Sequence, residues 1–383
     1  MRRNRIILLA LWLLSLAGIT FIGGQVSYGF FALFSLIPFL SLFYVFCVSK
    51  AFKIYQHINT QDIIAGRKAP YEFVLHNDSL IPFTGLHVVF FSRFSFIDGF
   101  DPSVEYELLP GDSIRMTSDL VCRYRGEYNV GIESIVIEDY FRLFSLTHMI
   151  KDPLIARVRP DIVDAEDLKQ AQPAFNAVTQ SQAKRSTADI LSREYVAGDD
   201  PRLINWKVSA ALGKLMVREM IGEEQQGVGI VMDSRRYSSQ PEEYLPIENK
   251  ILETVIALSL FFSKRGIPVS VYLEAGDPIR IDLNKDWGFE ELYEMLSAFS
   301  FNKNRNSRLC DRILSSESAA SKAAVFFVVH RWKDSFPGVA EHLRKYNVQV
   351  NILAVTDNPD QDASEVPSDI IYIDPDQDLK EVL

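Results

Sequence analysis

IILLALWLLSLAGITFIGGQVSYGFFALFSLIPFLSLFYVFCVS, residues 6–49, is an unbroken run without Asp, Glu, Lys or Arg. Gly-Gly-Gln at residues 23–25 interrupts the apolar pattern and leaves one segment near residues 6–22 and another near residues 28–48. A helix of about 20 apolar residues crosses a hydrocarbon core of roughly 30 Å. The run therefore predicts a transmembrane helical hairpin over residues 1–53, with a short uncharged turn between two helices.

Both flanks of the hairpin are basic: Arg2, Arg3 and Arg5 precede it, and Lys50 and Lys53 follow it. Because Lys and Arg next to membrane segments stay on the cytoplasmic side, we expect a multi-pass protein of the cell (inner or plasma) membrane. The bulk of the chain would then be cytoplasmic. The alternative is a secretory signal peptide followed by a buried core helix, which leaves the second uncharged segment unexplained.

Charge is distributed unevenly along the 383 residues. Five of the 40 basic residues and none of the 50 acidic residues lie in residues 1–53, so the remaining residues carry a net charge of −15. Such an acidic body repels polyphosphates, which argues against nucleic acid as a partner. The partner expected for the hairpin is membrane lipid, contacted through residues 6–48.

Residues 54–160 change to a two-residue period. Apolar and polar side chains alternate over residues 71–76 and 104–108, and turn sequences at residues 77–79 and 110–112 separate such runs. Short alternating strands at this spacing predict antiparallel sheets with a buried inner face. We therefore expect a β-rich, sandwich-like domain here.

Residues 161–222 contain an expected linker and, after it, the most distinctive segment of the chain. The linker is residues 164–190, which are rich in Ala, Gln, Ser, Asp and Lys and predict an exposed connection. REYVAGDDPRLINWK at residues 193–207 has the marks of a helix start, because Asp199 or Asp200 can cap the turn that follows and Pro suits its first position.

The same segment carries more charge than helix capping requires. Gly213 is expected to end the helix, and residues 214–219 have the pattern of a strand. The charged residues are Arg193, Asp199, Asp200, Arg202, Lys207, Arg218 and Glu219. They suit an ion-pair network that braces the α/β body or a polar contact surface, with capping and packing alone as the alternative.

This segment resembles the signature of the domain-of-unknown-function 58 family, an Arg-x-Tyr, Gly-Asp-Asp, Arg, Ile, Trp and Leu-x-Val-Arg pattern. The matching residues also include Ile204, Leu215 and Val217. We take as candidate signature and interaction residues Arg193, Tyr195, Gly198, Asp199, Asp200, Arg202, Trp206 and Arg218. The resemblance extends to residues 123–131, to residues 139–144 and to the opening hairpin, and it implies a membrane-anchored protein with a von Willebrand A-like C-terminal body.

Two positions depart from that family's pattern. The chain has Ala210-Ala211 where the family often has Ala-Arg. It has Asp-Tyr-Phe-Arg-Leu-Phe at residues 139–144 where Asp-Pro-Phe-Gly-Leu-Phe is common.

Residues 223–383 alternate apolar runs with helical patterns. Strands are expected at residues 227–232, 269–273, 279–283, 324–329, 348–355 and 370–373, and helices at residues 247–264, 289–300, 309–315 and 339–346. Continuous apolar strands separated by helices predict a mostly parallel sheet covered on both faces, an α/β domain of the Rossmann type. Its ligand sites are expected at the carboxyl ends of the strands.

Asp233 follows the first of these strands and opens the loop Asp-Ser-Arg-Arg-Tyr-Ser-Ser at residues 233–239. The loop resembles the Asp-x-Ser-x-Ser metal-binding loop of von Willebrand A domains, in which oxygen ligands hold a divalent cation, usually Mg²⁺. Here Arg235 and Tyr237 stand where the serines would be, and a guanidinium supplies no acceptor. We therefore expect a degenerate loop without metal, and no cofactor. A shifted register that used the later serines for Mg²⁺ is the alternative.

Other sequence signals for catalysis are weak. The chain has no GxxxxGK loop, no GxGxxG after a strand and no GxSxG elbow. Cys47, Cys122 and Cys310 are far apart, which argues against a zinc knuckle or a redox pair. His330 lies at the end of an expected strand without an identifiable nucleophile.

These observations favour a membrane-tethered, non-enzymatic adaptor or assembly protein. The family resemblance implies a MoxR-type AAA+ ATPase as its partner on the cytoplasmic side. A membrane-surface hydrolase or transferase, with Asp199, Asp200 and His330 gathered by folding, is the first alternative. A purely structural envelope protein is the second.

Overall fold

The computed structural model describes residues 1–58, 62–101, 103–164, 168–169, 171–179, 192–196, 204–218, 227–283, 288–302, 307–315, 319, 321–333, 335–357 and 370–382. They belong to two compact units, Met1–Arg159 and Pro160–Leu383. Each unit has its own apolar core.

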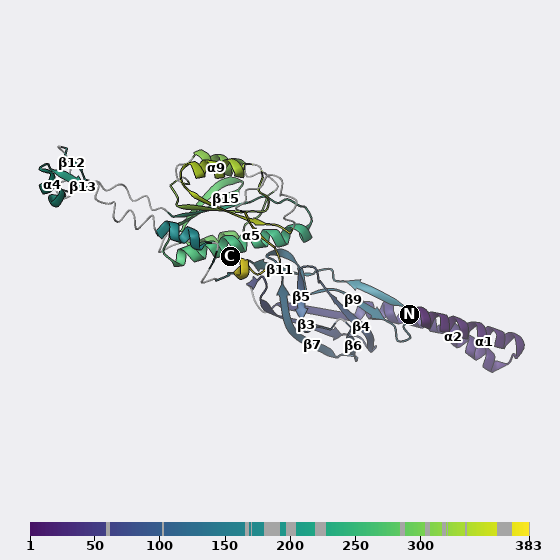
Figure 1. Cartoon of the computed structure of the whole chain (residues 1–383). Helices are drawn as coiled ribbons and strands as arrows, with labels where there is room; N and C mark the ends of the chain where they lie inside the picture. The colour runs from purple at the N-terminus through teal and green to yellow at the C-terminus, as the bar shows by residue number, and fades with distance from the viewer. Residues whose placement is uncertain are drawn as a thin grey trace. The chain divides into compact units, whose positions relative to one another are not determined.

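Two long apolar helices open the first unit, α1 (Arg2–Phe21) and α2 (Gln25–Ala51), drawn in purple in Figure 1. Both are long and apolar enough to cross a membrane. Most of their large apolar side chains are exposed, because no other described part of the protein covers them. The break predicted between them is confirmed: Gly23 and Gly24 have φ values of 67° and 85°, which residues with a Cβ rarely adopt. The helices contact each other along their length, where Trp12 Nε1 donates a hydrogen bond to Ser35 Oγ (2.9 Å).

The rest of the first unit is β-structure, as the two-residue period predicts. Its strands are β1 (Phe52–Ile58), β2 (Ile63–Ile64), β3 (Lys68–Asn77), β4 (Phe83–Phe90), β5 (Ser95–Asp98), β6 (Glu105–Leu108), β7 (Ser113–Cys122), β8 (Gly126–Val130), β9 (Ile132–Glu138), β10 (Ser145–Met149) and β11 (Leu154–Arg159). They form two antiparallel sheets, β1-β3-β7-β5 and β10-β9-β4-β6, and a small mixed sheet, β2-β11-β8.

One core joins the two larger sheets. Tyr71 and Phe73 of β3 are buried in the same cluster as Leu86 of β4 and Ile137 of β9. Glu72 and His76, which alternate with apolar residues along β3, are less buried. The alternation in the sequence therefore corresponds to an inner and an outer face of the sheet. Burying an aromatic or aliphatic side chain of this size contributes about 1.5–3 kcal/mol, so this layer holds the unit together.

The second unit contains a six-stranded sheet with the order β16-β15-β14-β17-β18-β19. Its elements are β14 (Val228–Met232), α5 (Pro241–Lys264), β15 (Val269–Ala275), β16 (Asp277–Leu283), α6 (Phe289–Ser297), α7 (Ser307–Ser315), β17 (Ala324–Val329), α9 (Phe336–Lys345), β18 (Gln349–Val355), β19 (Ile370–Ile373) and α10 (Leu379–Val382). All pairings are parallel except β15 with β16. The predicted α/β alternation and mostly parallel sheet are confirmed.

Helices cover both faces of this sheet. Helices α5 and α9 lie on opposite sides of it in Figure 1, and each side has its own apolar cluster. Along β17, Phe326 and Val328 belong to the α5 cluster, whereas Phe327 and Val329 belong to the α9 cluster. Side chains of one strand that serve both cores explain why the strand is apolar without interruption.

Part of the expected linker is not exposed, which corrects the sequence prediction. Within residues 164–190, the structure places Leu168, Ala171, Ala174 and Val178 in the α5 cluster with at most 1% of their surface exposed. Residues 172–179 are helical. The polar composition of this stretch therefore belongs to the outer face of a short helix that packs on the sheet.

Candidate ligand site

Three strand ends meet at the carboxyl edge of the six-stranded sheet. Asp233 follows β14, His330 follows β17, and Thr356 follows β18. Strand β14 pairs with β15 on one side and with β17 on the other. The chain connections therefore diverge between β14 and β17, and such a switch point is where open α/β sheets bind ligands.

The Asp233 carboxylate is buried and organises the loop after β14. Its Oδ1 accepts a hydrogen bond from the backbone N–H of Arg235 (3.0 Å). Its Oδ2 accepts from the Tyr237 hydroxyl (2.9 Å) and from the backbone N–H of His330 (3.2 Å). Because these donors replace water around the charge, the carboxylate can remain ionised at 0% exposure. It fixes the loop after β14 to the end of β17.

His330 presents one defined ring nitrogen to this site. Its Nδ1 lies 2.8 Å from the carbonyl oxygen of Val355, which can only accept, so Nδ1 carries the proton. Burial lowers the pKa of His330, although the hydrogen bond to Val355 and the charge of Asp233 oppose this effect. The ring is therefore neutral near pH 7, and its Nε2 carries a lone pair.

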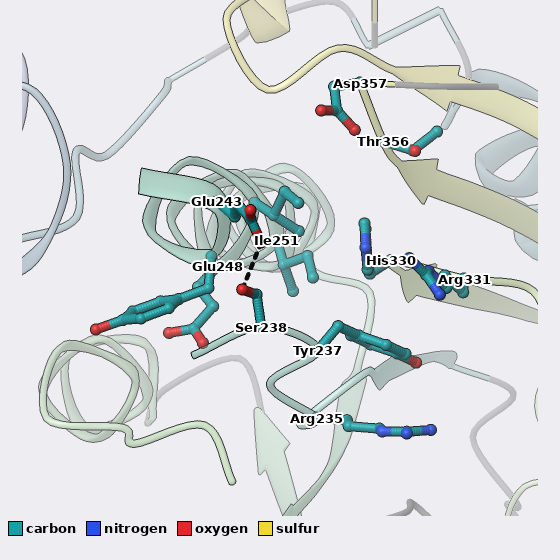
Figure 2. Close-up of a pocket in the computed structure, with 12 residues that line it drawn as sticks. Arg235, Tyr237, Ser238, Glu243, Glu248, Ile251, His330, Arg331, Thr356 and Asp357 are labelled. Carbon is teal, nitrogen blue, oxygen red and sulfur yellow. Dashed lines mark hydrogen bonds between the residues drawn. The ribbon is translucent and has the colours of Figure 1, made fainter. Parts of the chain in front are cut away.

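Tyr237 lies between two arginines. The guanidinium carbon of Arg235 is 4.6 Å from the centre of the Tyr237 ring, and that of Arg331 is 5.4 Å from it. Figure 2 shows the polar ends of the three side chains pointing the same way. The His330 ring meets the same tyrosine edge-on, with ring centres 4.8 Å apart. Tyr237 thus aligns two positive charges at the rim of the site.

Helix α5 forms the opposite wall of a cavity of about 350 Å³. Glu248 is 3% exposed, and its carboxylate accepts two hydrogen bonds from Arg236, at 2.6 and 2.9 Å. Glu243 on the same helix accepts from the Ser238 hydroxyl, as the dashed line in Figure 2 marks. The cavity is therefore lined by charges of both signs: Figure 2 shows Glu243 and Glu248 at α5, whereas Asp357 lies beside Thr356 at the end of β18, the strand next to the one that Arg331 follows.

In the expected register, other side chains occupy the two positions of the loop where serine ligands would stand. Tyr237 occupies one of the two positions where a serine ligand would stand, and its hydroxyl is hydrogen-bonded to Asp233. Arg235 occupies the other, and a guanidinium repels a dication. Ser238, the first of the later serines, is hydrogen-bonded to Glu243.

A second group of oxygen and nitrogen ligands lies in the first unit. Ligand atoms of His87, Glu105 and Glu138 all lie within 4.8 Å of one another. The Arg142 guanidinium is 2.5 Å from Glu105 and 3.9 Å from Glu138, so a cation is already present there in the form of a side chain. We assign no metal to this group.

The signature segment folds as a small unit of paired strands and a helix. Strand β12 (Ser192–Glu194) pairs with β13 (Met216–Arg218), so the Arg-x-Tyr half of the pattern lies against the Leu-x-Val-Arg half. Helix α4 (Trp206–Leu212) packs beside them, and the Ser209 hydroxyl accepts from the backbone N–H of Met216 (2.8 Å). The predicted end of this helix at Gly213 is confirmed, with φ 66°.

The start of that helix differs from the prediction. Helix α4 begins at Trp206, and the side chain of Asn205 caps it by accepting a hydrogen bond from the backbone N–H of Val208. Pro201 is therefore not its first residue. The expected capping residues Asp199 and Asp200 lie outside the described residues.

The candidate signature residues are placed only in part. Gly198, Asp199, Asp200 and Arg202 lie outside the described residues, and Arg193 and Arg218 are described in their backbone alone. The backbone N–H of Tyr195 donates to Leu215, and Trp206 is 66% exposed. The proposed contact surface of the signature stays a prediction.

The upstream motif at residues 139–144 contacts the helical hairpin. Asp139 is 2% exposed and accepts hydrogen bonds from the Ser41 hydroxyl of α2 (2.8 Å) and from the backbone N–H groups of Phe141 and Phe144. Arg142 has φ 52°, a conformation that glycine adopts without strain. That explains why glycine is common at this position in the pattern that the motif resembles.

Comparison with protein families places the C-terminal part of the chain. Residues 191–379 match the model described as "Protein of unknown function DUF58". Over these residues the chain belongs to the DUF58 family. The DUF58 region contains the paired signature strands and the whole carboxyl-edge cavity.

The solved structures that align with this chain are too different from it to indicate its fold or function. No curated protein matches the chain. Among solved structures, a GH20 exo-β-N-acetylglucosaminidase from Vibrio harveyi aligns over 85% of this chain and 78% of its own, with 9% identity and a TM-score of 0.18. A β-glucuronidase from Bacteroides uniformis aligns over 79% of this chain and 33% of its own, with 8% identity and a TM-score of 0.18.

Proposed function

We propose that this DUF58 protein is a membrane-anchored binding protein whose α/β unit recognises a carboxylate group of a partner protein at the carboxyl-edge cavity. The observation that carries the proposal is the alignment of Arg235 and Arg331 on the two sides of Tyr237. A guanidinium offers a planar array of N–H donors that suits a carboxylate. This arrangement supplies directly the positive charge that a metal ion supplies in von Willebrand A-like domains.

Arg331 is the residue best placed to meet such a ligand. Its side chain is exposed, and its guanidinium carbon lies 5.4 Å from the centre of the Tyr237 ring, at the cavity. Arg236, by contrast, already gives two hydrogen bonds to Glu248. The guanidinium of Arg331 can thus contact a partner, whereas that of Arg236 is already paired with Glu248 in the cavity wall.

A single carboxylate fits the site better than a polyanion. Glu243 and Asp357 line the same cavity as the arginines. These two carboxylates would repel the several negative charges of a triphosphate or a nucleic acid backbone. They would repel the single charge of one acidic side chain less. An acidic side chain of a protein surface is therefore the ligand class that we propose.

The cavity favours binding over catalysis. The Tyr237 hydroxyl donates to Asp233 and the Ser238 hydroxyl donates to Glu243, so neither is hydrogen-bonded to the base His330. A nucleophile needs a base within hydrogen-bond reach. The neutral Nε2 of His330 favours the alternative, a membrane-surface hydrolase or transferase.

The proposal includes the placement of the chain. Helices α1 and α2 would cross the membrane as a hairpin, since both have the required length and composition. Basic residues flank the hairpin at both ends, so its termini and the two units would lie in the cytoplasm. A MoxR-type AAA+ ATPase is the partner that we propose there, on the basis of the family resemblance.

Site-specific photocrosslinking in cells tests this proposal. A photoreactive phenylalanine analogue replaces Tyr244, which lines the cavity, and in a matched control it replaces Tyr346, which ends α9 at the opposite edge of the sheet. We expect a crosslinked partner protein at position 244 and not at position 346. Equal adducts at both positions, or none at position 244, would contradict a partner site in this cavity.

A further inference from the structure

The two N-terminal helices enclose an apolar groove near the end of the hairpin that carries the chain terminus. It has a volume of about 630 Å³, within the range of small-molecule sites. Leu8 and Leu9 of α1 and Phe34 and Phe39 of α2 line it, and so does Pro38, which lies inside α2. The groove is therefore suited to a flexible hydrocarbon chain.

An arginine lies at one end of this groove. Arg5 Nε donates a hydrogen bond to the carbonyl oxygen of Leu143 (2.6 Å), and its guanidinium carbon is 5.6 Å from the centre of the Phe144 ring. Leu143 and Phe144 also line the groove. A guanidinium has five N–H donors, so one bond to Leu143 positions the group while it leaves donors for a ligand.

The turn at residues 139–144 indicates how deep in a membrane this groove would lie. Asn4 Nδ2 donates to the carbonyl oxygen of Phe141 (2.9 Å), so the turn lies beside the first residues of α1. Tyr140 and Phe141 are 78% and 50% exposed. Exposed aromatic side chains beside the basic end of an apolar helix are typical of the membrane–water interface. In the proposed membrane placement, Arg5 therefore lies at the depth where lipid headgroups begin.

We propose that this groove binds one anionic phospholipid, with an acyl chain between α1 and α2 and its phosphate at Arg5. The inference depends on the proposed placement of the hairpin in a membrane. Charge complementarity selects the occupant: residues 1–53 contain Arg2, Arg3, Arg5, Lys50 and Lys53 and no acidic residue. Basic pockets between membrane helices on the cytoplasmic side bind anionic headgroups.

Native mass spectrometry of the full chain tests the proposal. The protein is released from nanodiscs that contain phosphatidylglycerol and phosphatidylcholine in equal amounts, and retained lipid is counted per chain. We expect one phosphatidylglycerol to be retained. Arg5→Gln should reduce this retention about fivefold, the effect of one basic residue at an anionic surface. Arg157→Gln, which changes the charge equally on β11, should retain lipid as the unchanged protein does.

A second pair of variants separates the groove from the charge. Leu9→Trp fills the groove and should abolish retention, whereas Leu14→Trp, on the same helix and outside the groove lining, should not change it. Equal retention of both lipids, or retention that Arg5→Gln and Leu9→Trp leave unchanged, would overturn this inference. Extraction of the whole protein from membranes by alkaline carbonate would instead overturn the proposed membrane placement.

Discussion

Replacing Asp233 by Asn tests whether this carboxylate is a structural acceptor. The amide of Asn has one acceptor oxygen, whereas donors reach both carboxylate oxygens from Arg235, Tyr237 and His330. Even in the better orientation, the backbone N–H of Arg235 faces an NH₂ group. Leaving such a donor unsatisfied costs about 1–3 kcal/mol. Asp233→Ala removes the acceptors for all three donors and should cost more.

Thermal unfolding of the full-length protein in detergent measures this cost, with peptide-resolved hydrogen exchange to assign the transition to the α/β unit. In a unit of this size, a loss of about 2 kcal/mol lowers the Tm by roughly 4–8 °C. The matched control is Asp277→Asn, because that carboxylate is 91% exposed. We expect the Tm of the control to remain unchanged.

The same assay with millimolar Mg²⁺ tests the reasoning behind the prediction. If Asp233 is saturated by protein donors, Mg²⁺ leaves the Tm of the unchanged protein where it was. A cation that binds Asp233, at a free concentration of about 100 times its Kd, would stabilise the unit by about 2.7 kcal/mol. A rise of the Tm with Mg²⁺ that Asp233→Asn removes would identify Asp233 as a metal ligand and refute our account of the loop.

Three further predictions concern charge and backbone strain. Arg236→Ala removes two hydrogen bonds from the buried carboxylate of Glu248 and should cost about 3–5 kcal/mol in urea unfolding, whereas Arg236→Met with Glu248→Leu should cost less. Burial lowers the pKa of His330, so the unfolded chain takes up its proton first: stability should fall as the pH decreases from the unfolded value near 6.5 through the folded pKa. His330→Gln should show a smaller fall over that range, and an identical fall would contradict the assignment. Arg142→Gly should be more stable than Arg142→Ala by about 1 kcal/mol, because both lose the contact with Glu105 and glycine alone relieves the positive φ; the opposite order would exclude backbone strain there.

The sheet of the second unit could be predicted because its central strands, β14 and β17, are apolar and buried on both faces. β17 and β19 have the expected bounds, residues 324–329 and 370–373. Helix α5 begins earlier than expected, at Pro241, since Pro at the first position and Glu242 and Glu243 in the first turn start it before the apolar pattern does. The apolar period in the sequence indicates only the part of a helix that packs against the core. It does not indicate where a polar first turn begins.

The contacts of the site could not be predicted in the same way. The strand-end positions of Asp233 and His330 were visible in the sequence, but they are 97 residues apart, and only the strand order brings them together. The placement of Arg331 over Tyr237 depends on the same order. The sequence does not predict the buried helix at residues 172–179, because its inner face is small: Ala174 and Val178 are buried and Phe175 is partly buried.

The central claim is that the carboxyl-edge cavity recognises an acidic partner through guanidinium groups and without a metal. The most direct measurement is the yield of the Tyr244 photocrosslink in cells and in membranes treated with EDTA, in the presence of Arg331→Glu or of Arg344→Glu as a charge-matched control on α9. We predict that Arg331→Glu lowers the yield about tenfold or more, as loss of a charged hydrogen bond implies, and that neither Arg344→Glu nor EDTA changes it. A yield that persists in Arg331→Glu, or that EDTA abolishes, would contradict the claim.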